Sequence, residues 1–129
     1  MLFRSEKEIK ECKIEINGKK ISFCYFYKFE KIGKYKIKYI FKNYLTKINY
    51  MFYNCSSLIN LNLSNFNTQN VIDMREMFYK CYSLINLNLS NFNTQHVTDM
   101  FGMFCNCNAL IIKSIITNDS KILNEIRNN

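Results

Sequence analysis

The sequence is poor in the features that mark several classes of protein. Its 129 residues include no proline, no tryptophan, one alanine, three glycines and one histidine. No stretch approaches the roughly 20 consecutive apolar residues that a membrane-spanning helix needs, so we expect no transmembrane segment. The first residues also lack the apolar core of a secretory signal peptide, so we expect no export signal.

The scarcity of histidine limits the metal and catalytic chemistry that the chain can offer. A structural zinc site needs four nitrogen or sulfur ligands, and Cys105-Asn106-Cys107 lacks the spacing of a C-x₂-C pair. Paired carboxylates and an activated nucleophile at a workable spacing are also missing. We therefore predict no metal site, no cofactor and no catalytic residue, which means a protein that is not an enzyme.

What the chain does have is apolar and aromatic surface to bury. Hydrophobic residues make up 48% and aromatic residues 16% of the sequence, which excludes a disordered chain. At this length we expect a single domain, 1–129. The abundance of lysine, asparagine, isoleucine, tyrosine and phenylalanine is typical of AT-rich coding, so these frequencies carry little functional weight.

The positive charge is concentrated in the first part of the chain. The formal net charge is +8, and residues 1–50 hold 13 basic and 5 acidic residues, whereas residues 51–102 hold 2 and 3. The composition therefore changes near Tyr50. A basic segment of this kind suits a negatively charged partner, although exposed lysines also serve solubility.

The central part of the chain consists of two nearly identical segments that follow each other without a gap. Residues 51–76 read MFYNCSSLINLNLSNFNTQNVIDMRE, and residues 77–102 read MFYKCYSLINLNLSNFNTQHVTDMFG. A partial copy opens at Met103, so we interpret 103–129 as a partial repeat and C-terminal cap. Repeats of this length predict stacked modules, which usually present a surface for binding rather than run a reaction.

Each repeat shows two hydrophobic patterns. The alternation at Leu61-Asn62-Leu63 predicts a short strand with leucines inward and polar residues outward. Apolar residues at i, i+3, i+7 and i+10 then predict one face of a short helix. These are Val71, Met74, Phe78 and Cys81, and their equivalents one repeat later. We therefore predict an α/β repeat solenoid with one short strand and one short helix per coil.

The same register extends to both ends of the chain. Shifting it back by one repeat predicts a degenerate coil at 32–50, and shifting it forward by one repeat places Ile115 level with Leu89. Upstream, Asn17-Gly18 between alternating stretches is a strong signal for a β-hairpin. We therefore predict that residues 12–41 form a β-rich N-terminal cap on the first coil.

Five of the six cysteines fall into two groups. Cys55, Cys81 and Cys107 share one repeat position, so they should form a column of buried free thiols, since equivalent side chains point in parallel rather than toward each other. Cys12 and Cys24 both lie on the predicted cap. The sequence leaves open whether these two form a disulfide.

The repeated unit resembles a known family. The string MF-x-x-C-x-S-L-x-x-L-N-L-S-N-F-N-T-x-x-V-x-D-M is similar to the BspA-like leucine-rich repeat, strongly over Met51–Leu110 and weakly over Ile32–Tyr50. The resemblance implies a right-handed solenoid of the surface-protein type, with a role in adhesion or protein–protein contact. It also implies a cell-surface or secreted location, with the cytoplasm as the alternative because no signal peptide is visible.

The outward positions of the predicted strands are the candidate binding residues. They are Lys36, Lys38, Asn60, Asn62, Ser64, Asn86, Asn88 and Ser90. We predict that this strand face binds a protein or glycan, and the competing interpretation is that its polar residues only keep the face soluble or hydrogen-bond to each other along the stack. The alternative function is binding of nucleic acid or anionic surfaces through the basic cap, with nucleic acid the less expected partner. We expect a monomer or an edge-to-edge homo-oligomer.

Overall fold

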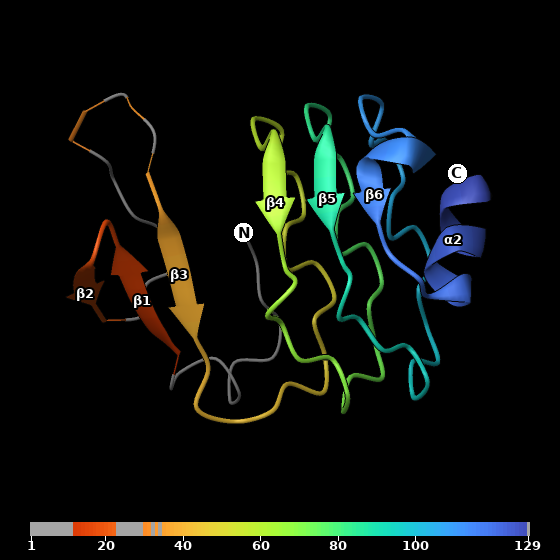
Figure 1. Cartoon of the computed structure of the whole chain (residues 1–129), viewed down its shortest axis with the longest axis horizontal. Helices are drawn as coiled ribbons and strands as arrows, with labels where there is room; N and C mark the ends of the chain where they lie inside the picture. Colours follow the sequence, from red (N-terminus) through yellow and green to blue (C-terminus); the bar gives the residue numbers. More distant parts are fainter. Residues whose placement is uncertain (1–11, 23–29, 32, 34, 129) are drawn as a thin grey trace.

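The computed structural model describes residues 12–22, 30–31, 33 and 35–128, which form two sheets and two short helices. The antiparallel sheet contains β1 (Lys13–Ile16), β2 (Lys19–Ile21) and β3 (Ile37–Ile40), and the parallel sheet contains β4 (Asn60–Asn62), β5 (Asn86–Asn88) and β6 (Ile115–Ile116). The helices are the 3-10 helix η1 (Ile112–Ser114) and the α-helix α2 (Ser120–Arg127). Figure 1 shows the antiparallel sheet at one end, the parallel sheet in the middle and α2 at the other end.

The predicted right-handed α/β solenoid, with one strand and one helix in every coil, is wrong. Two three-stranded sheets of opposite kind replace it, one antiparallel and one parallel. Within the described ranges the only α-helix is α2, which lies after the full repeats. The segment 71–81, expected to be helical, consists of turns and a single isolated bridge residue.

The antiparallel sheet is built on a hairpin. Asn17 and Gly18 have φ values of 48° and 85°, the positive values that a two-residue hairpin turn requires. This turn joins β1 to β2, and β3 pairs with the other side of β1. Because β3 belongs to this sheet, the strand of the predicted degenerate coil at 32–50 does not join the parallel sheet.

The parallel sheet keeps the register of the sequence repeat across its first pair of strands only. Leu61 lies opposite Leu87 in β4 and β5, which are equivalent positions of the two full repeats. In the next pair Leu87 lies opposite Ile115, so the predicted alignment of Ile115 with Leu89 is wrong by two positions. The 3-10 helix η1 directly precedes β6 and accommodates the two additional residues.

Backbone hydrogen bonds explain why no helix follows each strand. In an α-helix every amide donates to the carbonyl four residues earlier, whereas here alternate amides donate to a carbonyl in the following repeat. The pairs are Ile48–Asp73, Tyr50–Arg75, Phe52–Met77 and Asn54–Tyr79, then Met74–Asp99, Glu76–Phe101, Phe78–Met103 and Lys80–Cys105, all at 2.7–3.0 Å. Several of the amides in between, such as those of Met51 and Tyr53, donate three residues back and close tight turns.

Left-handed backbone conformations also exclude a helix at two positions in each repeat. Tyr50, Glu76 and Gly102 share the first position, and Asn54, Lys80 and Asn106 share the second, all with φ between 50° and 64°. A right-handed helix requires negative φ throughout. Nevertheless Val71, Met74, Phe78 and Cys81 are all fully buried. The apolar spacing thus identifies the core side chains correctly and misidentifies the element that carries them.

The core consists of columns of equivalent side chains from successive repeats. Phe52, Phe78 and Phe104 stack with ring centroids 5.6 Å apart at both contacts and planes within 13° of parallel. Met51, Met77 and Met103 are buried in the same core. Stacking aromatic rings contributes stability beyond that of burying their area.

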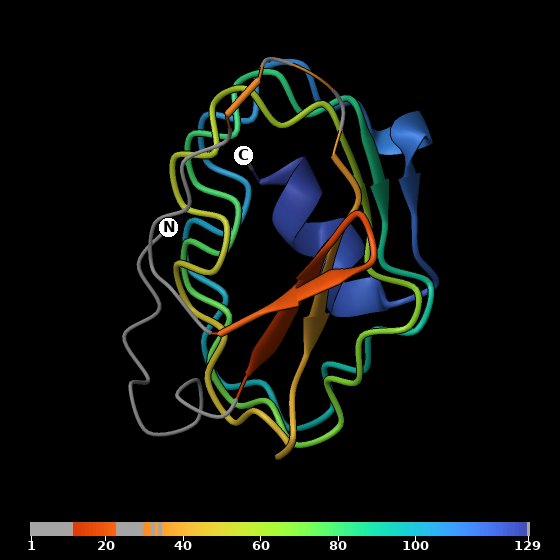
Figure 2. The ribbon, with the colours of Figure 1, turned by 90° about the vertical axis from the view of Figure 1, so that its left-hand side faces the viewer.

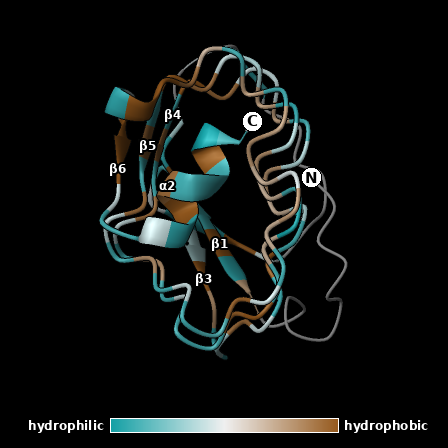
Figure 3. Ribbon diagram, turned by 90° about the vertical axis from the view of Figure 1, so that its right-hand side faces the viewer, coloured by the Kyte–Doolittle hydropathy of each residue, from teal (hydrophilic) through white to brown (hydrophobic). Residues whose placement is uncertain are grey.

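The two ends of these columns are covered by different elements. Seen from one end, the antiparallel sheet crosses in front of the repeats (Figure 2), and Tyr39 and Phe41 pack against the core there. Phe41 contacts Phe66 edge-on with centroids 5.7 Å apart. Seen from the other end, α2 lies across the opening (Figure 3), where Ile122 is fully buried.

Asp119 fixes α2 to the second repeat. Its carboxylate accepts hydrogen bonds from the amides of Lys121 and Ile122, which makes it the N-cap of the helix. The same carboxylate accepts from the hydroxyl of buried Thr94 at 2.8 Å, and Lys121 Nζ returns a hydrogen bond to the Thr94 carbonyl at 3.1 Å.

An ionic cluster joins the two full repeats beside the turns. Arg75 Nη2 lies 2.8 Å from Asp73 Oδ2, and its Nε lies 3.3 Å from Asp99 Oδ2. Burial disfavours the charged form of Asp73, but hydrogen bonds and charge from Arg75 outweigh it, so the pKa of this carboxyl lies below its usual range. Arg75 therefore separates two carboxylates that share one repeat position.

The phenylalanine column gives the first prediction. Replacing Phe78 by alanine removes the middle ring and should lower the free energy of unfolding by about 3–5 kcal/mol, measured by urea denaturation. The control is Tyr44→Ala, whose ring is 68% exposed and whose loss should cost no more than about 0.5 kcal/mol. A loss at Phe78 as small as that at Tyr44 would show that the column does not support the core.

The ionic cluster gives the second prediction. Because the folded pKa of Asp73 is depressed, its contribution to stability is complete above the unfolded pKa of about 3.9 and is lost as pH falls through the folded value. Arg75→Met should lower the urea midpoint at pH 7 and reduce the loss of stability on acidification toward pH 3.

A second substitution separates this effect from general damage. In the Arg75→Met background, Asp73→Asn should restore part of the lost midpoint, because it removes a carboxylate left beside Asp99 without its cation. If Asp73→Asn costs as much in that background as in the unsubstituted protein, then Arg75 does not act through Asp73.

Candidate functional site

The structure brings four of the predicted binding residues together on the parallel sheet. Asn60 lies opposite Asn86, and Asn62 lies opposite Asn88, one residue to either side of the paired leucines. The side-chain amide of Asn86 donates to Asn60 Oδ1 at 2.7 Å. These two asparagines therefore bond to each other across the repeats, which is the competing interpretation of the strand face.

The next asparagines along the strands are also engaged. Asn62 Oδ1 accepts from the amide of Ser64 at 2.9 Å, and Asn88 Oδ1 accepts from the amide of Ser90 at 3.0 Å. The Ser64 carbonyl in turn accepts from the side chain of Asn91. Such local bonds are typical of asparagine at the end of a strand, where it stabilises the turn that follows.

Apolar side chains border this polar strand face. Ile59 and Ile85 directly precede β4 and β5, Ile111 holds the equivalent repeat position before η1, and all three are exposed. On β6 the polar pattern ends, because Ile116 lies opposite Asn88 and is exposed. The predicted face is therefore two strands wide and its amide groups largely serve the fold.

The two predicted lysines lie on the other sheet. Lys38 is in β3, where it faces Glu15 across the strand pair. Lys36 directly precedes β3, and its amide donates to Asn17 Oδ1 at 2.9 Å. Since β3 pairs with β1 and not with β4, the lysines do not extend the asparagine rows as the sequence suggested.

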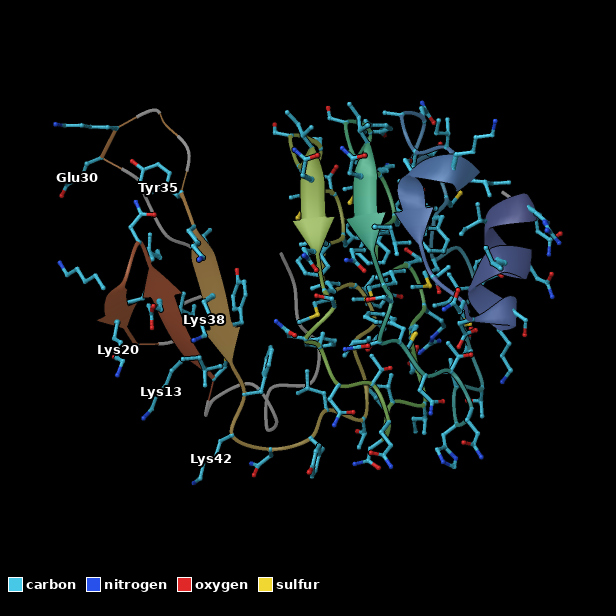
Figure 4. The ribbon with its side chains drawn as sticks, in the orientation of Figure 1. Lys13, Lys20, Glu30, Tyr35, Lys38 and Lys42 are labelled. Atoms are coloured by element: carbon cyan, nitrogen blue, oxygen red, sulfur yellow. The ribbon has the colours of Figure 1, made fainter. Side chains whose placement is uncertain are left out.

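The lysines instead belong to a charged surface on the antiparallel sheet. Glu15 lies between Lys20 on β2 and Lys38 on β3, directly opposite both. Cross-strand partners share a face of a sheet, as do residues two apart, so Lys13 lies on this face too. We call Lys13, Glu15, Lys20 and Lys38 the lysine face, and Figure 4 labels its three lysines.

The lysine face is open to solvent and its cations have no partner in the described part of the chain. All three lysines are exposed. No hydrogen bond or ion pair with another described residue holds the ammonium groups of Lys13, Lys20 or Lys38. The opposite face carries Ile14 and Ile16, which are buried.

Sequence reasoning missed part of this surface. Lys13, Glu15 and Lys20 were not among the candidate binding residues, although the two-residue turn at Asn17-Gly18 fixes which residues of β1 and β2 lie opposite each other. The pairing of Glu15 with Lys20 could thus have been derived. The position of Lys38 opposite Glu15 could not have been derived in this way. Residues 22–36 separate β2 from β3, and a connection of this length does not fix which residues of β1 and β3 pair.

The cysteines of the described residues are free thiols. Cys81 Sγ donates to the Phe52 carbonyl at 3.1 Å, and Cys107 Sγ donates to the Phe78 carbonyl at 3.0 Å. Burial raises the pKa of the Cys55 thiol in the same column. Cys12 is buried as well, and its predicted neighbour Cys24 lies outside the described residues.

Two further features bear on the chemistry of the chain. Among the described residues, no three His, Cys, Asp or Glu side chains gather closely enough to hold a metal ion. The helices found there are also too short and too polar to cross a lipid bilayer.

Comparison with known proteins identifies a family. No curated protein and no solved structure matches the chain. The model of a family described as "Mycoplasma protein of unknown function, DUF285" matches residues 22–125, which is most of the chain and includes both full repeats. The protein therefore belongs to the DUF285 family of mycoplasma proteins.

Proposed function

We propose that the chain is a non-catalytic recognition module that binds an acidic segment of a partner protein on its lysine face. The observation that carries this proposal is the row of Lys20, Glu15 and Lys38 with Lys13 beside it, in which no cation has a partner among the described residues. Elsewhere, each of the four strand asparagines already uses one side-chain oxygen or nitrogen in a hydrogen bond of the fold.

The details of the lysine face favour an acidic protein segment over nucleic acid. Proteins that hold single strands combine basic grooves with aromatic rings on which bases stack, and no strand position on this face holds an aromatic residue. Glu15 also places a negative charge at the centre. A protein segment can place discrete carboxylates around Glu15, whereas a continuous row of phosphates would cross it.

The sequence resemblance supports the same class of function. The BspA-like pattern of the repeated unit implies contact with proteins rather than catalysis. The asparagine strand face stays a second candidate surface, with a protein or glycan as its partner.

The test uses a fluorescent, glutamate-rich peptide titrated against the full chain at low salt. Replacing Lys13, Lys20 and Lys38 together by glutamine should weaken binding by about tenfold or more, since each exposed ion pair contributes modestly. Glu15→Gln should strengthen it. Binding should weaken steeply as salt rises, because charges on a surface are screened within about 10 Å at 0.1 M.

Lys19 provides a matched control. It is adjacent to Lys20 and equally a lysine on β2, but it faces the other side of the sheet, opposite Ile16. Lys20→Gln should weaken binding and Lys19→Gln should not, although both remove one positive charge. Equal effects would overturn the lysine face as the site, and tighter binding of a single-stranded RNA or of phosphatidylserine vesicles would overturn the acidic protein segment as the partner.

A further inference from the structure

A column of tyrosine rings runs along the outside of the repeats and ends before the third one. Tyr53 and Tyr79 stack with centroids 5.1 Å apart and planes 13° from parallel. The equivalent position in the third repeat is Cys105, which is much smaller. The column therefore stops at Tyr79, with nothing aromatic in the next position.

A neighbouring column also loses bulk at its last member, Gly102. Its members are Tyr50, Glu76 and Gly102, and all three have the same left-handed backbone. A Cβ atom on Gly102 would lie 3.4 Å from the Glu76 side chain, which shows that Glu76 lies close over the glycine. Two small residues side by side thus leave space on this face.

The space is a surface hollow of about 650 Å³. It lies between the turns of the second and third repeats and the C-terminal end of α2, which contributes Glu125 and Asn128. Tyr53, Tyr79 and Phe101 supply its aromatic lining. Its volume falls within the range of pockets that hold small molecules.

The lining has the chemistry of a site for a cation. Three aromatic residues and two carboxylates line it, and no lysine, arginine or histidine does. Aromatic faces attract cations through their quadrupole, and the C-terminal end of a helix carries partial negative charge. Glu76 has no hydrogen bond or ion pair through its carboxylate with any described residue. Phe101 is 75% exposed, so its ring is accessible from solvent.

An ammonium group of the chain itself already lies on one of these rings. Lys80 Nζ is 5.3 Å from the centroid of Tyr79. Tyr53 stacks on the same Tyr79 ring that Lys80 approaches. Lys80 is half-buried and does not line the hollow, so it competes with a bound cation for the Tyr79 ring rather than filling the space.

We propose that this hollow binds a small organic cation of the quaternary or methylated ammonium class. The methylated ammonium would lie against Tyr79 and Phe101, with Glu76 supplying the opposite charge. Such a group is weakly hydrated compared with the lysine ammonium that it displaces, which favours it on an aromatic surface. The hollow lies at the α2 end, far along the chain from the lysine face. An experiment can therefore disprove binding at one of the two sites without affecting the proposal for the other.

The experiment is a titration of the full ¹⁵N-labelled chain with tetramethylammonium chloride, followed by the amide signals of Gly102 and Cys105. We expect saturable shifts of these signals, and no comparable shifts with tert-butanol, which has a similar shape and no charge. Tyr79→Leu should weaken binding by about three- to thirty-fold, the range for a cation on an aromatic face. Lys80→Gln should tighten binding because it removes the internal competitor.

Cys105→Tyr provides the sharpest variant. It extends the column of Tyr53 and Tyr79 by one ring, as the preceding repeats do, and so fills the hollow while continuing a pattern that the fold already accepts. This variant should abolish the saturable shifts at Gly102. Glu76→Gln tests the same site without adding bulk and should weaken binding, whereas Tyr44→Leu, at an exposed tyrosine elsewhere, should not.

Three results would overturn the proposal. One is the absence of saturable shifts with tetramethylammonium in the unsubstituted chain. Another is equal binding of tert-butanol, which would make the hollow an apolar site rather than a cation site. The third is unchanged binding in a folded Cys105→Tyr or Glu76→Gln chain, with folding checked by the thermal midpoint.

Discussion

The rest of the structure depends on the pattern of its backbone hydrogen bonds. Successive amides donate alternately to a carbonyl of a neighbouring repeat and to a carbonyl of their own turn. In residues 48–54 and again in residues 74–80, four alternate amides donate to carbonyls of the next turn segment, and the left-handed residues at two fixed positions turn the chain so that they can. This pairing holds equivalent residues of successive repeats side by side. Because buried amides must find partners, the arrangement leaves little freedom to shift one repeat against the next.

Columns of like side chains follow directly from that pairing. Phe52, Phe78 and Phe104 stack inside, Tyr53 and Tyr79 stack outside, and Asp73 lies beside Asp99 with Arg75 between them. Where the side chain is apolar or aromatic, repetition is favourable, since each copy packs on the last. Where it is charged, repetition needs a compensating partner, which explains the position of Arg75.

Candidate functions arise where the columns are interrupted. At the α2 end, Gly102 and Cys105 replace larger residues and leave a hollow with aromatic and acidic walls. At the other end, the antiparallel sheet covers the first repeat and presents lysines that the repeats do not contain. The family match begins at residue 22, after β1 and β2, so Lys13 and Lys20 lie outside the matched segment. We therefore place both proposed binding roles at the ends of the repeats.

The sequence alone predicts which side chains are buried better than it predicts the helices and strands that carry them. The burial of Met74 and Phe78 follows from apolar spacing, and the Asn17-Gly18 turn follows from the preference of two-residue hairpin turns for this pair of residues. The helix was wrong because an apolar period near that of a helix also fits a run of tight turns whose alternate amides bond elsewhere. The two-residue shift at Ile115 depends on η1, which has no strong sequence signal.

The site was harder to predict than the core, for a physical reason. Asn60 and Asn86 are outward and polar as expected, but the sequence does not show that their amides satisfy each other. The lysine face needs the pairing of β1 with β3, a contact between segments whose connection carries no periodic pattern. Surface chemistry of this kind depends on long-range pairing, whereas core positions depend on local spacing.

The pairing of alternate amides is tested most directly by NMR couplings across hydrogen bonds, which identify the carbonyl that each amide contacts. The structure predicts a coupling between the Phe52 amide and the Met77 carbonyl, and another between the Phe78 amide and the Met103 carbonyl. Couplings from these amides to the carbonyls of Ile48 and Met74, four residues earlier, would instead demonstrate helices and contradict this account.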